Sequence, residues 1–241
     1  MAGVSAKLNN MTFLITGANR GIGLELSLFA LENNHRVIAL VRDPMQARTL
    51  QHSVKENPKY QEQLLILKCD VTELNEIREV KERIENEPID ILINNAGIML
   101  DDDETFTQLP LEKIELNIRT NALGSVAITQ EFLPNLLRSS QPKLVCISSQ
   151  MGSISGNSSG GYYAYRMSKA ALNMFAKSFS IDYPKVTTLV LHPGWVRTDM
   201  GGPQAPIMPR ESARGLFKVI TEAGLAQTGR FFDYSGKEIA W

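Results

Sequence analysis

Three tyrosines and a lysine lie close together in the second half of the chain, where they could carry acid–base chemistry. Residues 161–175 read GYYAYRMSKAALNMF, so Tyr162, Tyr163 and Tyr165 come shortly before Lys169. Residues four apart share one face of an α-helix, which pairs Lys169 with Tyr165. Tyr163 falls on the wrong side of the helix, and Tyr162 lies about 10 Å away along its axis. The spacing therefore selects Tyr165.

A phenol needs assistance to transfer a proton near neutral pH. Its ordinary pKa of about 10 makes it a weak proton donor and a weak base. A neighbouring ammonium group favours the phenolate and lowers that pKa. The pair suits the reduction of a carbonyl group, in which carbon receives hydride and oxygen receives a proton, and Lys169 could also hold the ribose of a nicotinamide cofactor. Taken alone, however, a tyrosine and a lysine at this spacing are more often surface neighbours.

Further polar residues follow the apolar runs that we expect to form strands. The segments NNAG (94–97), NALG (121–124) and ISSQMG (147–152) supply Asn94, Asn121 and Ser149. Together with Tyr165 and Lys169, these residues are expected at the carboxyl ends of strands or in the helices next to them. An open α/β sheet binds its ligand at that edge.

A glycine-rich turn near the N-terminus is suited to phosphate binding. The segment LITGANRGIGLEL (14–26) leads from an apolar run into a helical pattern. Gly17 permits a tight turn, Gly21 lets the backbone approach a pyrophosphate, and Gly23 lets the helix pack closely on the strand. The spacing is Gly-x-x-x-Gly-x-Gly and differs from the standard dinucleotide fingerprint. The alternative is a glycine turn without a ligand.

The end of the second apolar run bears on the choice of cofactor. An acidic residue there would bind the ribose 2′-hydroxyl of NAD, whereas an arginine would accommodate the 2′-phosphate of NADP. The chain has Arg42 followed by Asp43, and Arg20 in the glycine turn could reach the same phosphate. We therefore predict NADP(H) in preference to NAD(H), although a slip of one residue would reverse the choice. Asp70 could accept a hydrogen bond from the adenine amino group, cap the following helix, or do both.

The elements that must position these residues alternate between strand and helix. Most of the apolar runs are apolar on both faces, which is typical of parallel strands covered by helices on two sides. The expected strands are 12–16, 36–41, 63–68, 89–94, 143–148, 187–192 and a weaker 229–234. The expected helices are 21–33, 73–86, 111–138, 164–181 and 210–223. This pattern predicts an α/β fold with a doubly wound, Rossmann-like parallel sheet of about seven strands. We expect one domain over residues 1–241, with a short substrate loop at about 193–210.

The ordered motifs resemble those of the short-chain dehydrogenase/reductase family. They are Thr16-Gly17-x-x-x-Gly21-x-Gly23, Asn94-Asn95-Ala96-Gly97, Asn121, Ser149 and Tyr165-x-x-x-Lys169. The resemblance extends from residue 11 to the end of the chain. The segments GYYAYRMSKAALN, LHPGWVRTDMGG and IAW are similar to the subgroup that holds sniffer-type carbonyl reductases and bacterial C-factor proteins.

The resemblance implies a role for each matching residue. Tyr165 would be the general acid/base, Lys169 would tune it and bind the nicotinamide ribose, and Ser149 would bind the substrate oxygen. Asn121 would help to hold a water that links Lys169 to solvent, and Asn94 would brace the sheet. The implied cofactor-binding set is Gly17, Asn19, Arg20, Gly21, Ile22, Gly23, Arg42, Asp70, Val71, Asn95, Ala96, Gly97, Tyr165, Lys169, Pro193, Gly194, Val196 and Thr198.

Two features depart from the family pattern. Ser149 and Tyr165 are 16 positions apart, about three more than is typical of the family, so Ser148 remains an alternative to Ser149 as the substrate-orienting serine. We expect the extra residues to bulge at the rim of the site. Few residues separate Thr198 from the next helix, which predicts a small lid and an open pocket.

Composition narrows the possible partners. The formal net charge of −1 gives no basis for binding nucleic acid or an anionic membrane, and no run of about 18 apolar residues could span a bilayer. We expect a cytoplasmic protein. Cys69 and Cys146 lie in or beside apolar runs and are expected to be reduced core residues. No Cys/His cluster has the spacing of metal ligands, so no metal is predicted.

These observations favour an NADPH-dependent oxidoreductase that reduces aldehydes, ketones or quinones to alcohols, with Tyr165 as proton donor. The alternative from another class is a dinucleotide-binding signalling protein or redox sensor of C-factor type with little turnover. An extended-type epimerase is a third reading, for which the chain looks too short. Association into a homodimer or homotetramer is implied by the resemblance alone.

Overall fold

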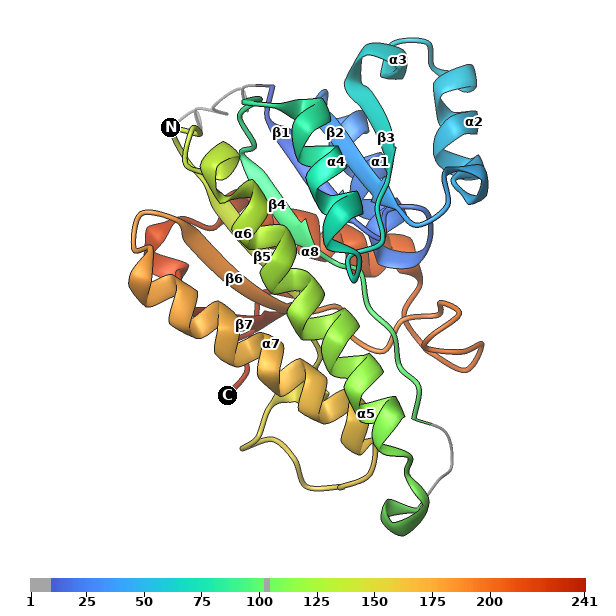
Figure 1. Cartoon of the computed structure of the whole chain (residues 1–241), viewed down its shortest axis with the longest axis vertical. Helices are drawn as coiled ribbons and strands as arrows, with labels where there is room; N and C mark the ends of the chain where they lie inside the picture. The colour runs from blue at the N-terminus through green and yellow to red at the C-terminus, as the bar shows by residue number, and fades with distance from the viewer. Residues whose placement is uncertain (1–9, 102–104) are drawn as a thin grey trace, which may run out of the picture.

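One parallel sheet of seven strands forms the centre of the molecule. A computed structural model describes residues 10–101 and 105–241 (Figure 1). The strands are Thr12–Thr16 (β1), Arg36–Val41 (β2), Leu64–Lys68 (β3), Ile91–Asn94 (β4), Lys143–Ile147 (β5), Thr187–His192 (β6) and Arg230–Asp233 (β7). Their order in the sheet is β3-β2-β1-β4-β5-β6-β7, and all neighbouring pairs are parallel. The predicted α/β fold is confirmed, and each predicted strand is present.

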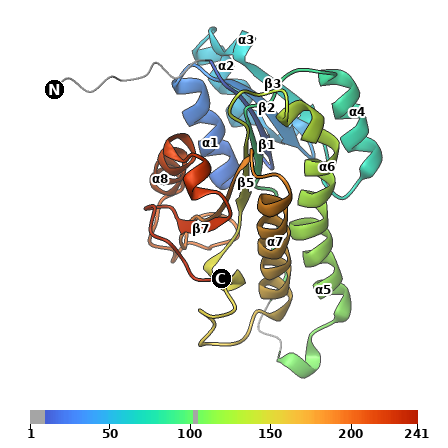
Figure 2. The ribbon, with the colours of Figure 1, turned by 90° about the vertical axis from the view of Figure 1, so that its left-hand side faces the viewer.

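The sheet is buried on both faces because its strands carry apolar side chains in both directions. On one face Phe13 and Ile15 belong to the core that includes residues of α1 and α8. On the other face Leu14 belongs to the core that includes residues of α4, α6 and α7. Figure 2 shows these two helical layers on opposite sides of the sheet. Burial of these alternating side chains fixes the strand register, since a slip of one residue would exchange the two faces.

The helices end within a few residues of the positions expected from the sequence, except in one long segment. They are Gly21–Glu32 (α1), Arg48–Glu56 (α2), Tyr60–Gln63 (α3), Leu74–Ile84 (α4), Leu111–Ile118 (α5), Gly124–Leu136 (α6), Tyr163–Asp182 (α7) and Pro209–Glu222 (α8). The segment expected as one helix over 111–138 is divided by a π-helical turn, η3, at Arg119–Leu123. The short helices α2 and α3 were not expected.

The sheet order sets the location of the candidate site. The chain turns outward in opposite directions from β1 and β4, which are neighbours in the sheet. In open α/β sheets, ligands bind outside the carboxyl ends of the strands at such a point. In the described residues, no helix is long and apolar enough to cross a membrane, and no group of three or more His, Cys, Asp or Glu side chains could hold a metal ion.

Candidate active site

Helix α7 carries one tyrosine into the interior and leaves the other two at the surface. Tyr165 has 7% of its surface exposed, whereas Tyr162 and Tyr163 have 49% and 40%. Lys169 is also buried, and its Nζ lies 5.6 Å from the centre of the Tyr165 ring. The helix begins at Tyr163, so Tyr165 and Lys169 occupy successive turns of one face. The structure thus agrees with the pairing that the spacing predicts.

The two serines that follow β5 point to different neighbours. Ser148 Oγ donates to Asn173 Oδ1 of α7 at 2.6 Å, so this hydroxyl is used in a buried hydrogen bond. Ser149 is close enough to the Tyr165 side chain to lower the pKa of the phenol, and its Oγ accepts from the Met151 amide at 3.1 Å. Ser149 therefore lies beside the phenol, and the alternative residue Ser148 is turned away from it.

Burial controls the ionisation of the pair. It raises the pKa of Tyr165 to about 12, and the side chain of Ser149 only partly opposes this. Burial also lowers the pKa of Lys169 to about 8. The sequence led us to expect a lowered pKa for the phenol because of the ammonium beside it. The structure gives the opposite net direction, because removing the phenolate from water outweighs the favourable interactions.

Lys169 has one hydrogen-bond acceptor among the described residues. Its Nζ donates to the Ile147 carbonyl, at the last position of β5, over 2.9 Å. Gly97 faces the same nitrogen, because a Cβ built on it would lie 3.5 Å from Lys169 Nζ and 3.1 Å from Asn121 Oδ1. A larger residue at this position would crowd both side chains. The other two N–H donors of Lys169 have no acceptor among the described residues, so a ligand could bind them.

Asn121, in the π-helical turn, joins three segments of the site. Its Nδ2 donates to the Ile98 carbonyl and to Ser168 Oγ, each at 2.8 Å, and its Oδ1 accepts from the Ile98 amide at 2.8 Å. The side chain is fully buried. These bonds hold the segment after β4 against α7, so Asn121 is brought to the site as predicted. Its proposed part in holding a water remains a prediction.

The glycine turn forms a tight cradle between β1 and α1. Gly17 and Gly21 have φ of 64° and 54°, which favours glycine. A Cβ on Gly23 would lie 2.4 Å from the Gly17 carbonyl oxygen, so no larger residue fits. Asn95 fastens the turn by donating to the Thr16 carbonyl at 2.8 Å. No side chain caps the start of α1, and its first N–H groups are therefore available to an anion.

Three charged residues around the glycine turn differ in whether their side chains have a hydrogen-bond or ion-pair partner. Asp43 accepts from the Met45 amide at 2.9 Å and caps the short helix η1 (Pro44–Gln46). Arg42 is exposed and has no side-chain partner among the described residues. Arg20 forms an ion pair with Asp199 of the loop after β6, with 2.7 Å between Nη1 and Oδ2. The structure therefore leaves Arg42 free to meet a phosphate and directs Arg20 toward the loop.

The remaining predicted cofactor-binding residues surround this cradle. Asp70 Oδ1 accepts from the amide and the hydroxyl of Thr72 at 2.9 and 2.8 Å, in the turn that precedes α4. It does not cap the helix itself, because the N-cap of α4 is Glu73 and no side chain caps it. Thr198 lies over the glycine turn, 3.3 Å from a Cβ built on Gly21. Asn19 and Ile22 belong to the glycine turn and the start of α1, and Ala96 lies 3.0 Å from a Cβ built on Gly17. Val71 lies against Gly124 at the start of α6, and the loop after β6 contains Pro193, Gly194 and Val196.

One residue at the site, Asp101, was not among those that the sequence singled out. Asp101 belongs to a run of acidic residues that resembles a solvated loop, of which residues 102–104 lie outside the described part of the chain. Asp101 instead accepts hydrogen bonds from the amides of Ala164 and Tyr165 at 2.9 and 2.8 Å. The available signal was the start of α7 itself, where no Ser, Thr, Asp or Asn directly precedes the helix.

Known proteins share both the sequence pattern and the fold. The "C-signal" protein of Myxococcus xanthus is 42% identical over 167 residues, which cover 64% of this chain and 93% of that protein. The 1-hydroxy-2-glutathionyl-2-methyl-3-butene dehydrogenase of a Rhodococcus species is 30% identical over 95% of this chain and 99% of its own length.

Two solved structures agree closely with this one. The NADPH-bound carbonyl reductase from chicken fatty liver has a TM-score of 0.87 and 33% identity, covering 97% of this chain and 100% of that one. The carbonyl reductase Sniffer of Drosophila melanogaster has a TM-score of 0.86 and 31% identity, with 96% and 99% covered. The sequence model of the short chain dehydrogenases matches residues 11–206. The chain therefore belongs to the short-chain dehydrogenase family of oxidoreductases.

Proposed function

We propose that the protein reduces the carbonyl group of aldehydes, ketones or quinones to an alcohol with NADPH. The observation that carries this proposal is the buried cluster of Tyr165, Lys169 and Ser149 beside an open glycine cradle. Binding of a dinucleotide alone would not require a buried phenol and a serine beside it. Carbonyl reduction uses both.

The residues present fit a bound dinucleotide. The uncapped start of α1 and the Gly17–Gly21–Gly23 turn offer backbone N–H groups to phosphates. Lys169 Nζ has two N–H donors without an acceptor among the described residues, and ribose hydroxyls could accept from them. Arg42 is free to form charged hydrogen bonds with a 2′-phosphate, while Asp43 is engaged in capping, which favours NADP(H) over NAD(H). The solved relatives with bound NADP or NADPH support the same choice.

The protein groups would divide the reaction as follows. The nicotinamide, when bound, supplies the hydride. The Ser149 hydroxyl donates a hydrogen bond to the carbonyl oxygen and orients it toward Tyr165. The Tyr165 hydroxyl transfers its proton to that oxygen as negative charge develops, and the phenolate left behind is stabilised by the Lys169 ammonium, whose Nζ lies 5.6 Å from the ring centre. In the reverse direction the phenolate accepts the proton.

A panel of carbonyl compounds tests this function. NADPH fluorescence would be followed with aldehydes, ketones and quinones, and NADPH affinity would be measured separately by titration. We expect oxidation of NADPH with at least one class and product alcohol in equal amount. Clear NADPH binding without turnover on any class would contradict the proposal. That result would favour the second candidate, a dinucleotide-binding signalling protein, which the identity to the C-signal protein supports.

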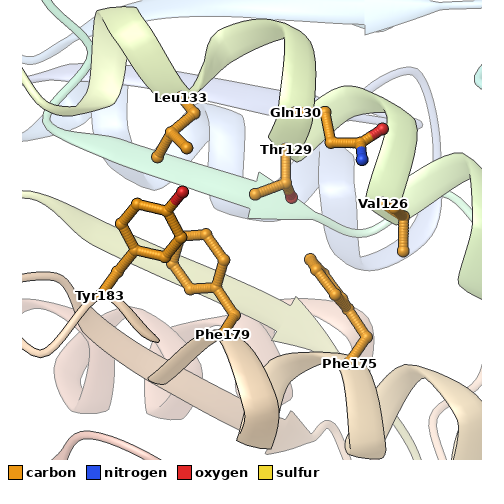
Figure 3. A pocket seen from close by; sticks show the side chains of 7 residues that line it. All are labelled: Val126, Thr129, Gln130, Leu133, Phe175, Phe179 and Tyr183. Atoms are coloured by element: carbon orange, nitrogen blue, oxygen red, sulfur yellow. The ribbon is translucent and has the colours of Figure 1, made fainter. Parts of the chain in front are cut away.

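We also propose that two copies associate through α6 and α7. Between these helices lies an apolar groove of about 270 Å³ (Figure 3), lined by Val126, Thr129, Gln130, Leu133, Phe175, Phe179 and Tyr183. Leu123, in the turn before α6, is 57% exposed, and Met174 of α7 is 66% exposed. Light scattering should give the mass of two copies, or of four if a second surface also pairs. A monomeric parent, or an unchanged mass in the Leu123→Glu/Met174→Glu variant, would contradict this pairing.

A further inference from the structure

The helix that carries Tyr165 begins without a cap from its own sequence. It emerges from a continuously exposed segment, 154–163, in which Gly160 and Gly161 both have positive φ. Its N-cap residue, Tyr162, has a left-handed backbone with φ of 50° and provides no capping side chain. The first turn of a helix leaves N–H groups unpaired, and a segment this exposed would fray if nothing held it.

Asp101 supplies the missing cap from 63 positions away. Its Oδ1 accepts from the Ala164 amide at 2.9 Å, and its Oδ2 accepts from the amide of Tyr165 itself at 2.8 Å. A carboxylate at a helix N-terminus both satisfies these donors and interacts favourably with the helix dipole. The position of Tyr165 along the helix axis is thus tied directly to Asp101.

The segment that bears Asp101 is itself fixed to the cofactor cradle. The amides of Asn95 and Ala96 both donate to Thr16 Oγ1 at 2.9 Å, next to the glycine turn. Three positions before Asp101, the amide and the carbonyl of Ile98 are both bonded to Asn121. Hydrogen bonds therefore hold the segment after β4 at three points: next to the glycine turn, at Asn121 and at the start of α7.

We propose that Asp101 is a positioning residue for Tyr165, holding the start of α7 against the cofactor cradle and placing a fixed negative charge beside the phenol. This inference rests on the proposed function, because it assigns Asp101 to the same reaction. The carboxylate has two opposed effects. It holds the backbone of Tyr165 in place, and its charge makes the phenol harder to ionise.

The groups around Tyr165 have distinguishable effects on its pKa. Asp101 raises the pKa of Tyr165, in the same direction as the larger effect of burial, while the side chain of Ser149 lowers it. Lys169 lies on the same helix, 5.6 Å from the ring centre. Arg166 is the neighbouring cation on α7, but its guanidinium is bonded to the Gly160 and Gly161 carbonyls. Replacing Asp101 with a neutral residue should therefore lower the pKa of Tyr165.

Three substitutions separate the charge of Asp101 from its shape. Asp101→Asn keeps an acceptor oxygen and removes the charge, Asp101→Glu keeps the charge on a longer side chain, and Asp101→Ala removes both. Asp182→Asn is the matched control, because it removes an exposed negative charge from the last residue of the same helix, about 25 Å from Tyr165 along the axis.

The test follows the Tyr165 hydroxyl directly by NMR of protein labelled with ¹³C at tyrosine Cζ, with the signal assigned from Tyr165→Phe. Asp101→Asn and Asp101→Ala should move the Tyr165 titration to lower pH by about 0.5–1 unit, while Asp101→Glu and Asp182→Asn leave it unchanged. The rising limb of alcohol oxidation against pH should move in the same way. Asp101→Ala should also lose roughly tenfold in kcat, because Tyr165 is no longer held in place.

An unchanged Tyr165 titration in Asp101→Asn would overturn the inference, as would an equal displacement in Asp182→Asn. If Asp101→Ala does not fold, the Asn and Glu variants still decide the question. The NMR titration needs no substrate or turnover. A parent protein without carbonyl reductase activity would therefore refute the proposed function while leaving the influence of Asp101 on Tyr165 measurable.

Discussion

Two buried lysines sit at opposite ends of β5 and differ in how the fold uses them. At the amino end, Lys143 Nζ donates to the carbonyls of Ile220, Thr221 and Ala223 at 2.7, 3.1 and 2.7 Å. At the carboxyl end, Lys169 Nζ donates to the Ile147 carbonyl alone among the described residues. Burial lowers the pKa of both ammonium groups.

The difference shows what distinguishes a structural charge from a functional one in this fold. An ammonium group has three N–H donors, and those of Lys143 are all used to close the carboxyl end of α8. Burial also disfavours the charged form of Lys169, which has one hydrogen bond in return. A buried ammonium with unused donors is a candidate for binding a ligand.

We expect the largest effect when the hydroxyl of Tyr165, beside Lys169, is removed. Tyr165→Phe keeps the buried ring and deletes only the hydroxyl, so folding and NADPH binding should persist. Because a positioned acid contributes about 10² to 10⁴ in rate, carbonyl reduction should fall by that factor. Tyr162→Phe and Tyr163→Phe serve as controls and should stay within several-fold of the parent, since both tyrosines are exposed. A dead Tyr163→Phe with an active Tyr165→Phe would refute the assignment.

The burial of Lys169 should make the free energy of unfolding depend on pH. Its pKa is about 8 in the folded protein and 10.5 in an unfolded chain. The penalty for burying its charge is fully present below pH 8 and is relieved as pH rises toward 10.5, because the unfolded state then binds more protons. Between these values the free energy of unfolding of the parent should rise relative to Lys169→Met by up to about 3 kcal/mol. Denaturant titrations should detect it, and a constant difference would show that Lys169 is not desolvated.

The opposite lysine should matter for stability alone. Lys143→Met leaves the Ile220, Thr221 and Ala223 carbonyls without their donor, and hydrogen bonds to charged groups contribute about 1.5–3 kcal/mol. We expect a loss of that size in the free energy of unfolding, measured by urea titration. Lys185→Met is the control, because it removes an exposed lysine just before β6 and should change stability by less than about 0.5 kcal/mol. An equal loss in the free energy of unfolding in both variants would show that the hydrogen bonds of Lys143 do not contribute to stability.

Two arginines extend the comparison to the cofactor preference. Arg42 has no partner among the described residues, whereas Arg210 pairs with Glu25 and Glu32. Arg42→Ala should narrow the preference for NADPH over NADH by about ten- to a hundredfold, because a charged hydrogen bond to the 2′-phosphate is lost. Arg210→Ala removes the same charge and should leave the preference unchanged. Fluorescence titrations with both cofactors measure the ratio, and equal affinities in the parent would show that Arg42 does not bind the phosphate.

The fold could be predicted from the sequence because its signals are local. Seven apolar runs mark the seven strands, and the glycine turn marks the start of α1. Helix α2 escaped notice because most of its residues are polar and Leu50 is its one buried residue. The π-helical turn at Arg119–Leu123 was also invisible, because one widened turn hardly changes the spacing of apolar residues over 111–138.

The site was predictable in part, for the same reason. The pairing of Tyr165 with Lys169 follows from helix geometry, and the structure brings both residues together with Ser149. Asp101 contacts Tyr165, and Arg20 contacts Asp199. The residues of each pair lie far apart in the chain, so no local sequence pattern predicts these contacts. The raised pKa of Tyr165 depends on how completely the folded chain excludes water, which spacing alone does not reveal.

The most direct test of the account compares NADPH affinity and stability in Lys169→Met and Lys143→Met. We predict that Lys169→Met binds NADPH about ten- to a hundredfold more weakly while remaining folded, because donors reserved for the cofactor are lost. Lys143→Met should keep the parent affinity and lose stability, since its donors all serve the fold. Unchanged NADPH affinity in Lys169→Met would contradict the claim that Lys169, whose N–H donors are not all used by the fold, binds the cofactor.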